Sequence, residues 1–424
     1  MEKFIIHGCK PLEGELEVRG AKNAAFPLLA ATLLTKNDSF IENLPLIEDV
    51  YRMIEILESM GAEVTWFRER SVCISTKHVN PSTMDTELVR RFRGSVLLMG
   101  PLLSRFGKVF LPVPGGDIIG ARPIYTHLDA FSQLGACIVS RGNGFEVSLS
   151  KRPKAAEVVL KEFSVTATEN LALFGGLHPY PLRIKIADQD YQVQEIMRAL
   201  VSMGARATFS DPHTIDIQGR KYLKTLRHKL LYDPIEAGTF LLLAIGTRGR
   251  ITIKNVEVRF LDLLFKTLKD SGARFEIRKR KNLGDIMVSP FRKLVIEKIQ
   301  SFIYPGISSD LQSAFGVLAT QAQGSTLLHD PLYEGRLKYL EELNKMGAHI
   351  HFSDPHRAVI NGPTTLKGAE LGAADIRGGA ALIMASLMAQ GKSTLSNIYQ
   401  IDRGYEKIEE RLQNIGADIV RVSS

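Results

Sequence analysis

Cysteine is scarce in this chain of 424 residues. There are three cysteines, Cys9, Cys73 and Cys137, far apart from one another. The odd number and the wide spacing argue against a disulfide framework and against a cysteine-based zinc site. A reducing compartment is therefore expected, and we place the protein in the cytoplasm.

Long apolar runs are missing as well. No run approaches the roughly 20 apolar residues that a helix needs to cross a bilayer. The first residues, 1–6, lack the pattern of a signal peptide and are typical of a strand. We therefore expect no membrane insertion. The apolar content of 45% and the charged content of 24% are ordinary for a globular protein.

The positive charge is not concentrated. The net charge is +8, but the basic residues are mostly dispersed, whereas nucleic-acid binding usually gathers them in one stripe. The one dense run, Arg-Lys-Arg-Lys at 278–281, follows a strand and predicts an exposed hairpin tip. Small polyanionic substrates would suit the net charge, and we expect no nucleic-acid partner.

What the chain does have is a repeat. The pair Gly-Ala occurs six times between a helix-like run and a strand-like run, at spacings of 74, 69, 68, 75 and 69 residues. Such a period suits a small α/β unit used six times. Each glycine stands where a helix end favours a left-handed residue. The six glycines are Gly61, Gly135, Gly204, Gly272, Gly347 and Gly416.

Each unit also contains a second helix that is apolar nearly all round, which predicts burial on every side. These helices are expected near 24–34, 95–103, 169–177, 236–245, 311–322 and 379–389. The inferred unit is β-α-β-α-β-β, used six times. Three units would form one domain, in which buried helices are wrapped by sheets and amphipathic helices, and two such domains would pack face to face.

Two repeats share the sequence Phe-Ser-Asp-Pro-His, at 209–213 and 352–356. Asp-Pro is turn chemistry and predicts a hairpin at each place. The histidines His213 and His356 are therefore interpreted as turn residues rather than ligands, and no metal or other cofactor is expected.

The residues that precede the six buried helices are unusually polar. Ser, Thr and Asp are common helix caps, but capping does not require Lys22, Arg93 or Arg377. Helix amino termini favour anions. If the six starts converge on one cleft, that cleft combines cations with carboxylates, which suits binding a polyanion and moving protons on it.

One loop departs from the repeat. Residues 111–123 contain three glycines and three prolines. A long surface turn is one interpretation. The other is a lid that carries Asp117 and Arg122 and closes over a substrate.

Five motifs, in order along almost the whole chain, resemble those of the UDP-N-acetylglucosamine 1-carboxyvinyltransferases, an enolpyruvyl transferase family. They are Gly-Ala-Lys-Asn-Ala-Ala at 20–25, the glycine-rich loop at 114–123, Ser-Asp-Leu-Gln at 309–312, Ala-Asp-Ile-Arg at 374–377 and Ile-Asp-Arg-Gly-Tyr at 401–405. The resemblance implies a two-domain inside-out α/β barrel with three units per domain. One domain would span 22–231 and carry the flexible loop 112–123; residues 1–21 and 232–424 would form the other, with the active site in the cleft between them.

The implied reaction moves the enolpyruvyl group of phosphoenolpyruvate to the 3-hydroxyl of UDP-N-acetylglucosamine and releases phosphate. It is the first committed step of peptidoglycan synthesis, on which bacterial cell shape and division depend. The chemistry is addition followed by elimination through a tetrahedral ketal. It needs a base, an acid and cations for phosphate and carboxylate.

The resemblance also implies residue roles. Asp310 is the candidate base, Asp375 assists it or orients the sugar, and Asp117 is the candidate acid. Phosphoenolpyruvate would be held by five cationic side chains: Lys22, Arg122, Arg403, Arg336 and Arg377. Lys22 and Arg403 are also candidate catalytic residues. The UDP-sugar would contact a second group of residues: Asn23, Arg93, Arg122, Ser164, Val165, Thr166, Asp233 and Asp310.

Asp117 departs from the family, in which cysteine is common at this place. An ordinary aspartic acid, with a pKa near about 3.9, is ionised at neutral pH. A raised pKa, caused by loop closure and nearby substrate anions, is therefore expected. Fosfomycin inactivates the cysteine form by alkylating the thiol, and a carboxylate is a far poorer nucleophile toward its epoxide. The sequence thus predicts fosfomycin resistance.

A second departure concerns the nucleobase. Tyr125 and Thr126 replace an Asp-Leu pair that meets uracil in the family, and Tyr125 offers a ring that could stack on the base. Two alternatives remain: another acceptor on the same fold, such as a nucleoside or shikimate 3-phosphate, and a nucleic-acid-binding protein. The glycine-rich loop argues against shikimate 3-phosphate, and the carboxylates Asp310 and Asp375 argue against nucleic acid.

Overall fold

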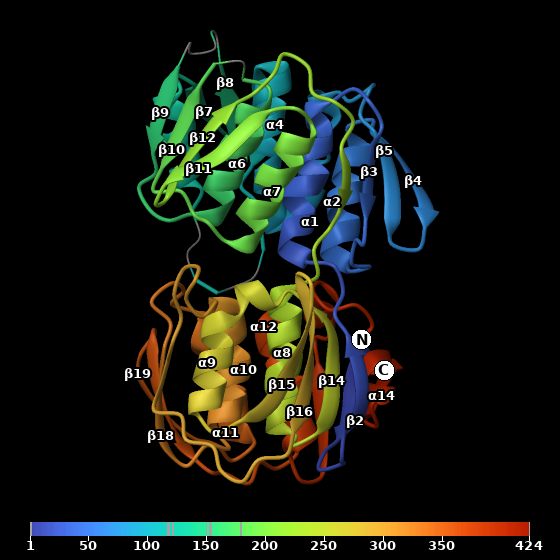
Figure 1. The fold of residues 1–424 in the computed structure, drawn as a ribbon, viewed down its shortest axis with the longest axis vertical. Coiled ribbons are helices and arrows are strands. Elements are labelled where there is room, and N and C mark those ends of the chain that lie inside the picture. Colours follow the sequence, from blue (N-terminus) through green and yellow to red (C-terminus); the bar gives the residue numbers. More distant parts are fainter. Residues whose placement is uncertain are drawn as a thin grey trace. The chain divides into compact units, whose positions relative to one another are not determined.

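The computed structural model describes residues 2–116, 119–120, 123–149, 151, 155–178 and 180–423. The chain forms two compact units (Figure 1). Unit 1 comprises Met1–Arg19, Asp117–Ala121 and Tyr232–Ser424, and unit 2 comprises Gly20–Gly116 and Arg122–Leu231. The expected domains differed at two places. The first crossover follows Arg19 rather than residue 21, and Ile119 groups with unit 1, where its carbonyl accepts from the Gly335 N–H at 3.0 Å.

Unit 2 contains three sheets. In the two four-stranded ones, one parallel pair of strands is followed by two antiparallel pairings. The third has three antiparallel strands within the described residues. In spatial order the sheets are β13 (Arg227–Lys229), β3 (Ser39–Glu42), β5 (Ser71–Ser75), β4 (Glu63–Arg68); β9 (Ala156–Val159), β10 (Leu182–Lys185), β12 (Thr214–Gln218), β11 (Arg206–Asp211); and β6 (Lys108–Pro112), β8 (Gly144–Ser148), β7 (Cys137–Arg141).

Unit 1 repeats this plan with three four-stranded sheets. The amino-terminal strand β1 lies between β22 and β23, so the start of the chain completes the sheet of the last repeat. In spatial order the sheets are β2 (Glu13–Glu17), β14 (Arg250–Val256), β16 (Leu283–Ser289), β15 (Arg274–Arg280); β17 (Lys298–Gln300), β18 (Gly324–His329), β20 (Arg357–Gly362), β19 (His349–Asp354); and β21 (Glu370–Gly372), β22 (Lys392–Ser396), β1 (Glu2–His7), β23 (Asp418–Ser423).

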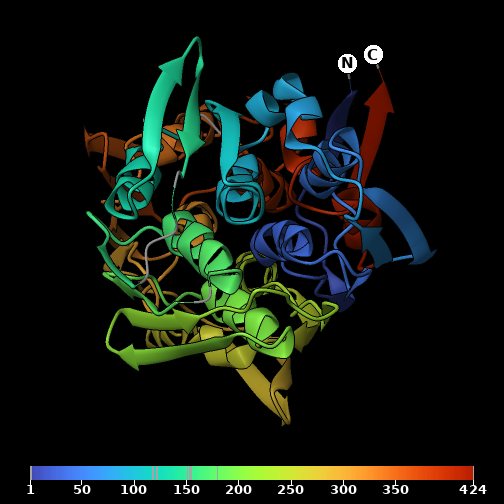
Figure 2. The same cartoon turned by 90° about the horizontal axis from the view of Figure 1, so that it is seen from above.

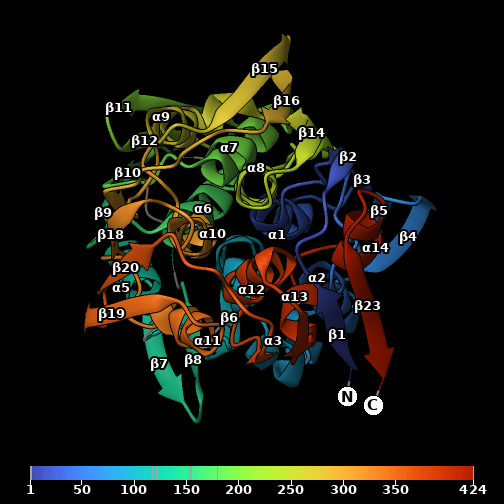
Figure 3. The same ribbon diagram turned by 90° about the horizontal axis from the view of Figure 1, so that it is seen from below.

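Three helices pack on one another inside each unit, and the strands lie around them (Figures 2 and 3). In α8 and α12 nearly every residue is buried, as their uniformly apolar sequences predicted. This is the inside-out α/β arrangement expected from the sequence. The inner helices are α1 (Lys22–Ala31), α4 (Met99–Phe106) and α6 (Val165–Gly176) in unit 2, and α8 (Pro234–Gly246), α10 (Ser309–Ala319) and α12 (Ile376–Met388) in unit 1.

The amphipathic outer helices end at the six Gly-Ala pairs. Each glycine has a positive φ, between 81° at Gly135 and 101° at Gly204. After each one, the alanine N–H donates to a helix carbonyl five residues back, as Ala62 does to Leu57 at 3.1 Å and Ala348 to Leu343 at 3.0 Å. The left-handed caps expected from the sequence are therefore present in all six repeats. The outer helices are α2 (Glu48–Ser59), α5 (Tyr125–Gln133), α7 (Tyr191–Ser202), α9 (Asp262–Asp270), α11 (Tyr339–Lys345) and α14 (Ile408–Gln413).

Short helical segments complete the repeats. They are η1 (Thr32–Leu34), η2 (Pro81–Thr83), α3 (Thr86–Arg91), η3 (Arg93–Leu98), η4 (Val258–Phe260), η5 (Arg336–Lys338) and α13 (Tyr399–Asp402). The basic run 278–281 lies at the exposed tip of the β15–β16 hairpin, and both Asp-Pro-His sequences turn a hairpin, as expected.

The chain passes from one unit to the other after Arg19 and again after Leu231, and backbone hydrogen bonds lie beside both places. The Ala21 N–H donates to the Leu231 carbonyl at 2.9 Å, and the Asp233 N–H donates to the Arg19 carbonyl at 2.8 Å. Accordingly, β2 pairs with β14 in unit 1 and β13 pairs with β3 in unit 2. The crossovers thereby hold the amino termini of α1 and α8, where Lys22 and Asp233 lie.

Candidate active site

The predicted site residues form two sets, one in each unit. Unit 1 carries Asp233, Asp310, Arg336, Asp375, Arg377 and Arg403. Unit 2 carries Lys22, Asn23, Arg93, Ser164, Val165 and Thr166. Asp117 and Arg122 lie outside the described residues.

Asp310 is the centre of the unit 1 set. It stands in the first turn of α10, and two arginines hold its carboxylate. The Arg336 Nη2 donates to Oδ1 at 2.9 Å, and the Arg377 Nε and Nη2 donate to Oδ2 at 3.2 and 3.1 Å. Both guanidinium groups are almost fully buried, whereas 23% of the Asp310 side chain is exposed. A partly exposed side chain whose carboxylate is bound by two buried guanidinium groups thus stands at the start of an inner helix.

The charges of the two arginines are secured by these partners. Burial lowers the pKa of Arg336, but Asp310 and Asp375, together with Tyr333 and Asp330, raise it above its ordinary value. Burial also lowers the pKa of Arg377, and Asp310, Tyr405 and Asp233 together raise it well above its ordinary value. Both groups therefore stay cationic.

Residues that the sequence reasoning did not assign extend this network. The Arg336 Nε donates to the Ser309 hydroxyl at 3.1 Å, which in turn donates to the buried carboxylate of Asp330 at 2.5 Å. On the other side, the Arg377 Nη1 donates to the Tyr405 hydroxyl at 3.2 Å. Ser309 and Tyr405 stand within motifs that the sequence singled out, but no local signal points to Asp330.

Two predicted carboxylates serve as helix caps. Asp375 Oδ1 accepts from the Arg377 and Gly378 N–H groups, both at 3.0 Å, and also lies 3.6 Å from Arg336 Nη1. Asp233 accepts from the first two N–H groups after Pro234 in α8. Arg403 donates to Gln400 at 2.8 Å and is 7% exposed. Capping and a contact with substrate are compatible, since a carboxylate can accept about four hydrogen bonds.

In unit 2, Lys22 begins α1 and is nearly buried. Its Nζ lies 3.1 Å from Asp49 Oδ2, on the first turn of α2, and 5.9 Å from the centre of the Phe26 ring. Asn23 follows it and is partly exposed. Asp49 was not anticipated, because it comes from another helix of the same repeat. It supplies the counter-charge that a nearly buried lysine requires.

Ser164 caps α6 as expected, since its hydroxyl accepts from the Ala167 N–H at 3.3 Å. Thr166, the second residue of the helix, meets the ring Nε2 of His127 at 3.1 Å. His127 lies on α5 and is 3% exposed. Burial, and secondarily Arg93, lower its pKa to about 3. The sequence analysis assigns no role to this histidine.

The loop that precedes the undescribed residues packs closely on unit 2. A Cβ on Gly115 would lie 1.7 Å from the Arg90 carbonyl, and one on Gly116, where φ is +132°, would lie 2.7 Å from the Arg93 Cβ. The Arg93 Nη2 also donates to the Pro123 carbonyl at 3.3 Å. Glycine is therefore required on this side of the loop by close backbone approach.

Tyr125 begins α5 with 69% of its surface exposed. The next residue, Thr126, donates to Glu162 at 2.6 Å and so links the starts of α5 and α6. Tyr125 is thus available at the place where the sequence suggested an aromatic contact with the base.

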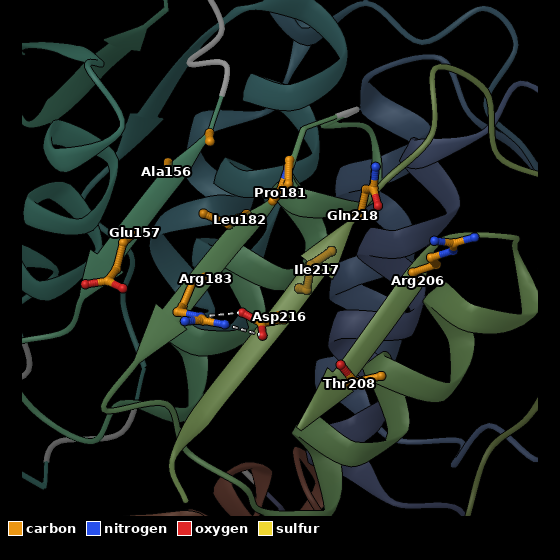
Figure 4. A pocket seen from close by; sticks show the side chains of 11 residues that line it. Ala156, Glu157, Pro181, Leu182, Arg183, Arg206, Thr208, Asp216, Ile217 and Gln218 are labelled. Carbon is orange, nitrogen blue, oxygen red and sulfur yellow. Dashed lines mark hydrogen bonds and ion pairs between the residues drawn. The ribbon is translucent and has the colours of Figure 1, made fainter. Parts of the chain in front are cut away.

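A separate groove of about 560 Å³ lies on the sheet β9-β10-β12-β11 (Figure 4). Its lining contains none of the predicted site residues. Two of the ion pairs at the groove are Arg183 with Asp216, at 2.7 and 2.8 Å, and Glu157 with Lys185, at 2.9 Å. Arg206 also lines the groove.

Within the described ranges, no group of three His, Cys, Asp or Glu residues is arranged to hold a metal ion. In the same ranges, no helix has both the length and the apolar character needed to cross a membrane.

Comparison with known proteins agrees with this architecture. The profile of the EPSP synthase (3-phosphoshikimate 1-carboxyvinyltransferase) family matches residues 6–412. A UDP-N-acetylglucosamine 1-carboxyvinyltransferase from Carboxydothermus hydrogenoformans is 38% identical over 423 residues, covering 100% of both chains. One from Coxiella burnetii is 38% identical over 424 residues, covering 100% of this chain and 97% of its own.

Solved structures show the same fold at low identity. The enolpyruvyl transferase NikO from Streptomyces tendae gives a TM-score of 0.89 at 22% identity, over 100% of this chain and 99% of its own. An EPSP synthase from Acinetobacter baumannii gives 0.77 at 17% identity, over 100% of both chains. The fold is thus that of the enolpyruvyl transferases. The full-length identity to the curated relatives is more specific, and this chain belongs to the UDP-N-acetylglucosamine 1-carboxyvinyltransferase family.

Proposed function

We propose that this protein transfers the enolpyruvyl group of phosphoenolpyruvate to the 3-hydroxyl of UDP-N-acetylglucosamine and releases phosphate. The observation that carries the proposal is the Asp310 carboxylate, which is held by Arg336 and Arg377 and belongs to a side chain that is 23% exposed. A base beside two cations is what an alcohol needs in order to attack a dianionic substrate.

The proposed chemistry has two stages. In the addition, Asp310 takes the proton of the acceptor hydroxyl, the sugar oxygen bonds to C2 of phosphoenolpyruvate, and Asp117 protonates C3. In the elimination, the Asp117 carboxylate takes a proton back from C3, the C2–C3 double bond re-forms, the C2–O bond to phosphate breaks, and the leaving phosphate takes the proton held by Asp310. The products are the enolpyruvyl ether and inorganic phosphate, so atoms and charges balance without a cofactor.

The other residues bind the two substrates. Lys22, Arg122, Arg403, Arg336 and Arg377 hold phosphoenolpyruvate through its phosphate and carboxylate. Asp375 and Asp233 orient the acceptor sugar, and Asn23 binds its acetamido group. Ser164, Val165 and Thr166 meet the diphosphate at the positive end of α6, with Arg93 and Arg122 beside it.

The test is phosphate release from the purified protein with phosphoenolpyruvate and one acceptor at a time. Release should require UDP-N-acetylglucosamine. Uridine and shikimate 3-phosphate, each tested at the same concentration, should give rates at least about a hundredfold lower. Faster release with either of these acceptors, or release without any acceptor, would overturn the proposal.

The reaction would place the protein at the entry to peptidoglycan synthesis, and through it in the control of cell shape and division. The cytoplasm, where phosphoenolpyruvate and nucleotide sugars are available, is the proposed location. Depletion in growing cells should cause rounding and lysis, with accumulation of UDP-N-acetylglucosamine. Normal wall growth after complete depletion would contradict this role.

A further inference from the structure

The buried histidine of unit 2 has a fixed protonation and a fixed direction. His127 Nδ1 lies 3.0 Å from Asn170 Nδ2. The Asn170 Oδ1 accepts from the Gly100 N–H at 2.7 Å, and its Nδ2 also donates to the Val96 carbonyl at 2.9 Å. The amide therefore points its second N–H at His127 Nδ1, which must be the accepting nitrogen.

The opposite nitrogen must then carry the proton. With Nδ1 as acceptor, the neutral imidazole has its hydrogen on Nε2, and this N–H donates to the Thr166 hydroxyl at 3.1 Å. The low pKa of about 3, caused by burial and then by Arg93, keeps the ring neutral throughout the physiological range. The direction of the bond does not change with pH there.

The consequence falls on Thr166. A hydroxyl has one hydrogen to donate, and its oxygen is already accepting from His127. No other hydrogen-bond partner of the Thr166 side chain occurs in the described part of the chain. The Thr166 side chain is partly exposed in the first turn of α6, beside the capping residue Ser164. Its O–H is thus left to donate to an anion at the helix amino terminus.

We propose that His127 is a positioning residue for the UDP-sugar. It does not touch the ligand; it holds the Thr166 hydroxyl with its oxygen turned inward and its hydrogen turned toward a diphosphate oxygen. Asn170 sets the tautomer that makes this direction obligatory. The inference rests on the proposed function, because it deepens the role given there to Thr166.

The experiment compares four single variants of the full-length enzyme, and the double variant that combines His127→Phe with Thr166→Val, by steady-state phosphate release and by calorimetric titration with UDP-N-acetylglucosamine. His127→Phe removes the N–H donor and Thr166→Val removes the hydroxyl. His127→Gln can keep an N–H near the position of Nε2, and Thr166→Ser keeps the hydroxyl.

His127→Phe and Thr166→Val should each raise the KM and the Kd for UDP-N-acetylglucosamine about tenfold, as expected for one hydrogen bond to a charged group. The KM for phosphoenolpyruvate should change less than about twofold. The double variant should be no worse than either single one, since both remove the same contact. His127→Gln and Thr166→Ser should recover most of the affinity.

Three results would overturn the inference: a His127→Phe enzyme that binds the UDP-sugar as tightly as the wild type, additive effects in the double variant, or equal losses of affinity for both substrates. If His127→Phe does not fold, Thr166→Val on its own must still show the selective loss. Failure of the wild type to bind UDP-N-acetylglucosamine would instead refute the proposed function itself.

Discussion

Arg377 binds one oxygen of Asp310 with two nitrogens, Nε at 3.2 Å and Nη2 at 3.1 Å, while its remaining nitrogen Nη1 reaches Tyr405. Arg336 takes the other oxygen. The carboxylate is therefore fixed in orientation by two nearly buried cations before any substrate arrives. Preorganisation of this kind is what lets a base accept a proton without first reorganising its surroundings.

Asp310→Asn should remove the proton-accepting carboxylate while it keeps the size and shape of the side chain. We expect kcat to fall by a factor of about 10² to 10⁴. The free energy of unfolding should fall by about 2 kcal/mol, because two buried arginines lose a counter-charge that is itself partly exposed to solvent. Phosphate release and urea denaturation measure the two effects.

Asp270→Asn is the matched control in unit 1. Asp270 pairs with Lys266 in an exposed i,i+4 ion pair, with 60% of its side chain accessible. Its replacement should leave kcat unchanged and alter stability by no more than about 0.5 kcal/mol. An Asp310→Asn enzyme with wild-type turnover would remove Asp310 from the mechanism.

The sequence predicted the frame well because the frame depends on local rules. A left-handed residue must end each outer helix, and only glycine adopts that conformation freely, so Gly-Ala marks six helix ends. Helices buried on all sides must be apolar all round, and α8 and α12 could therefore be predicted from the sequence. No comparable rule predicted that β1 would complete the sheet of the last repeat, since strand pairing over such a distance leaves no local trace.

The candidate site was predictable only where its residues share a motif. Asp310, Asp375 and Arg377 stand at helix starts that the sequence singled out, and the structure brings them together around Arg336. Asp49, Asp330 and His127 were missed for a common reason. Each one acts on a site residue from a different helix or loop, and a lone buried polar residue has no periodicity that distinguishes it from an ordinary one.

Two of the repeat glycines offer a matched pair of substitutions. A Cβ on Gly347 would meet nothing within 4 Å, whereas one on Gly272 would lie 2.6 Å from the Lys293 carbonyl; φ is +90° and +94° respectively. Gly347→Ala should therefore cost only backbone strain, about 1 kcal/mol. Gly272→Ala should cost at least about 1 kcal/mol more, because its methyl also forces backbone apart.

Chemical denaturation of the two variants at pH 7 checks this ranking. Equal losses of stability would show that the backbone at Lys293 moves to accommodate the new methyl group at no energetic cost. A Gly347→Ala protein as stable as the wild type would show that a left-handed cap costs nothing here.

Glu169 lies inside unit 2 with 1% of its surface exposed, and neither carboxylate oxygen has a hydrogen-bond partner in the described ranges. Burial, then Asp190 and Asp188, raise its pKa well above the ordinary value of 4.5. The folded protein therefore keeps a proton that the unfolded chain loses. Stability from this group is present below about pH 4.5 and declines as the pH rises toward the folded-state pKa.

Glu169→Gln should remove that decline. Relative to the wild type, the free energy of unfolding of the variant should rise by up to about 1.4 kcal/mol for each pH unit above 4.5, until the folded-state pKa is reached. Urea denaturation at pH 5 and pH 8 measures the difference in free energy of unfolding between the two proteins. The control is Glu157→Gln on the exposed side of β9. A constant difference for Glu169→Gln would mean that the carboxyl finds a partner that compensates its charge.

Asp117 is expected to be the acid that protonates C3, and a carboxylic acid can do this only while it holds its proton. The rate of the wild type should therefore fall as the pH rises through the pKa of Asp117 in the substrate complex, and Asp117→Asn should lose turnover by about 10² or more.

Asp117→Cys should restore activity with an alkaline limb at higher pH, because a thiol has a pKa near about 8.5. It should also become sensitive to fosfomycin, since a thiolate opens the epoxide far faster than a carboxylate. Time-dependent loss of activity with fosfomycin, followed by mass spectrometry for a covalent adduct, distinguishes the two enzymes. Inactivation of the wild type, or near-normal turnover of Asp117→Asn, would rule out this role.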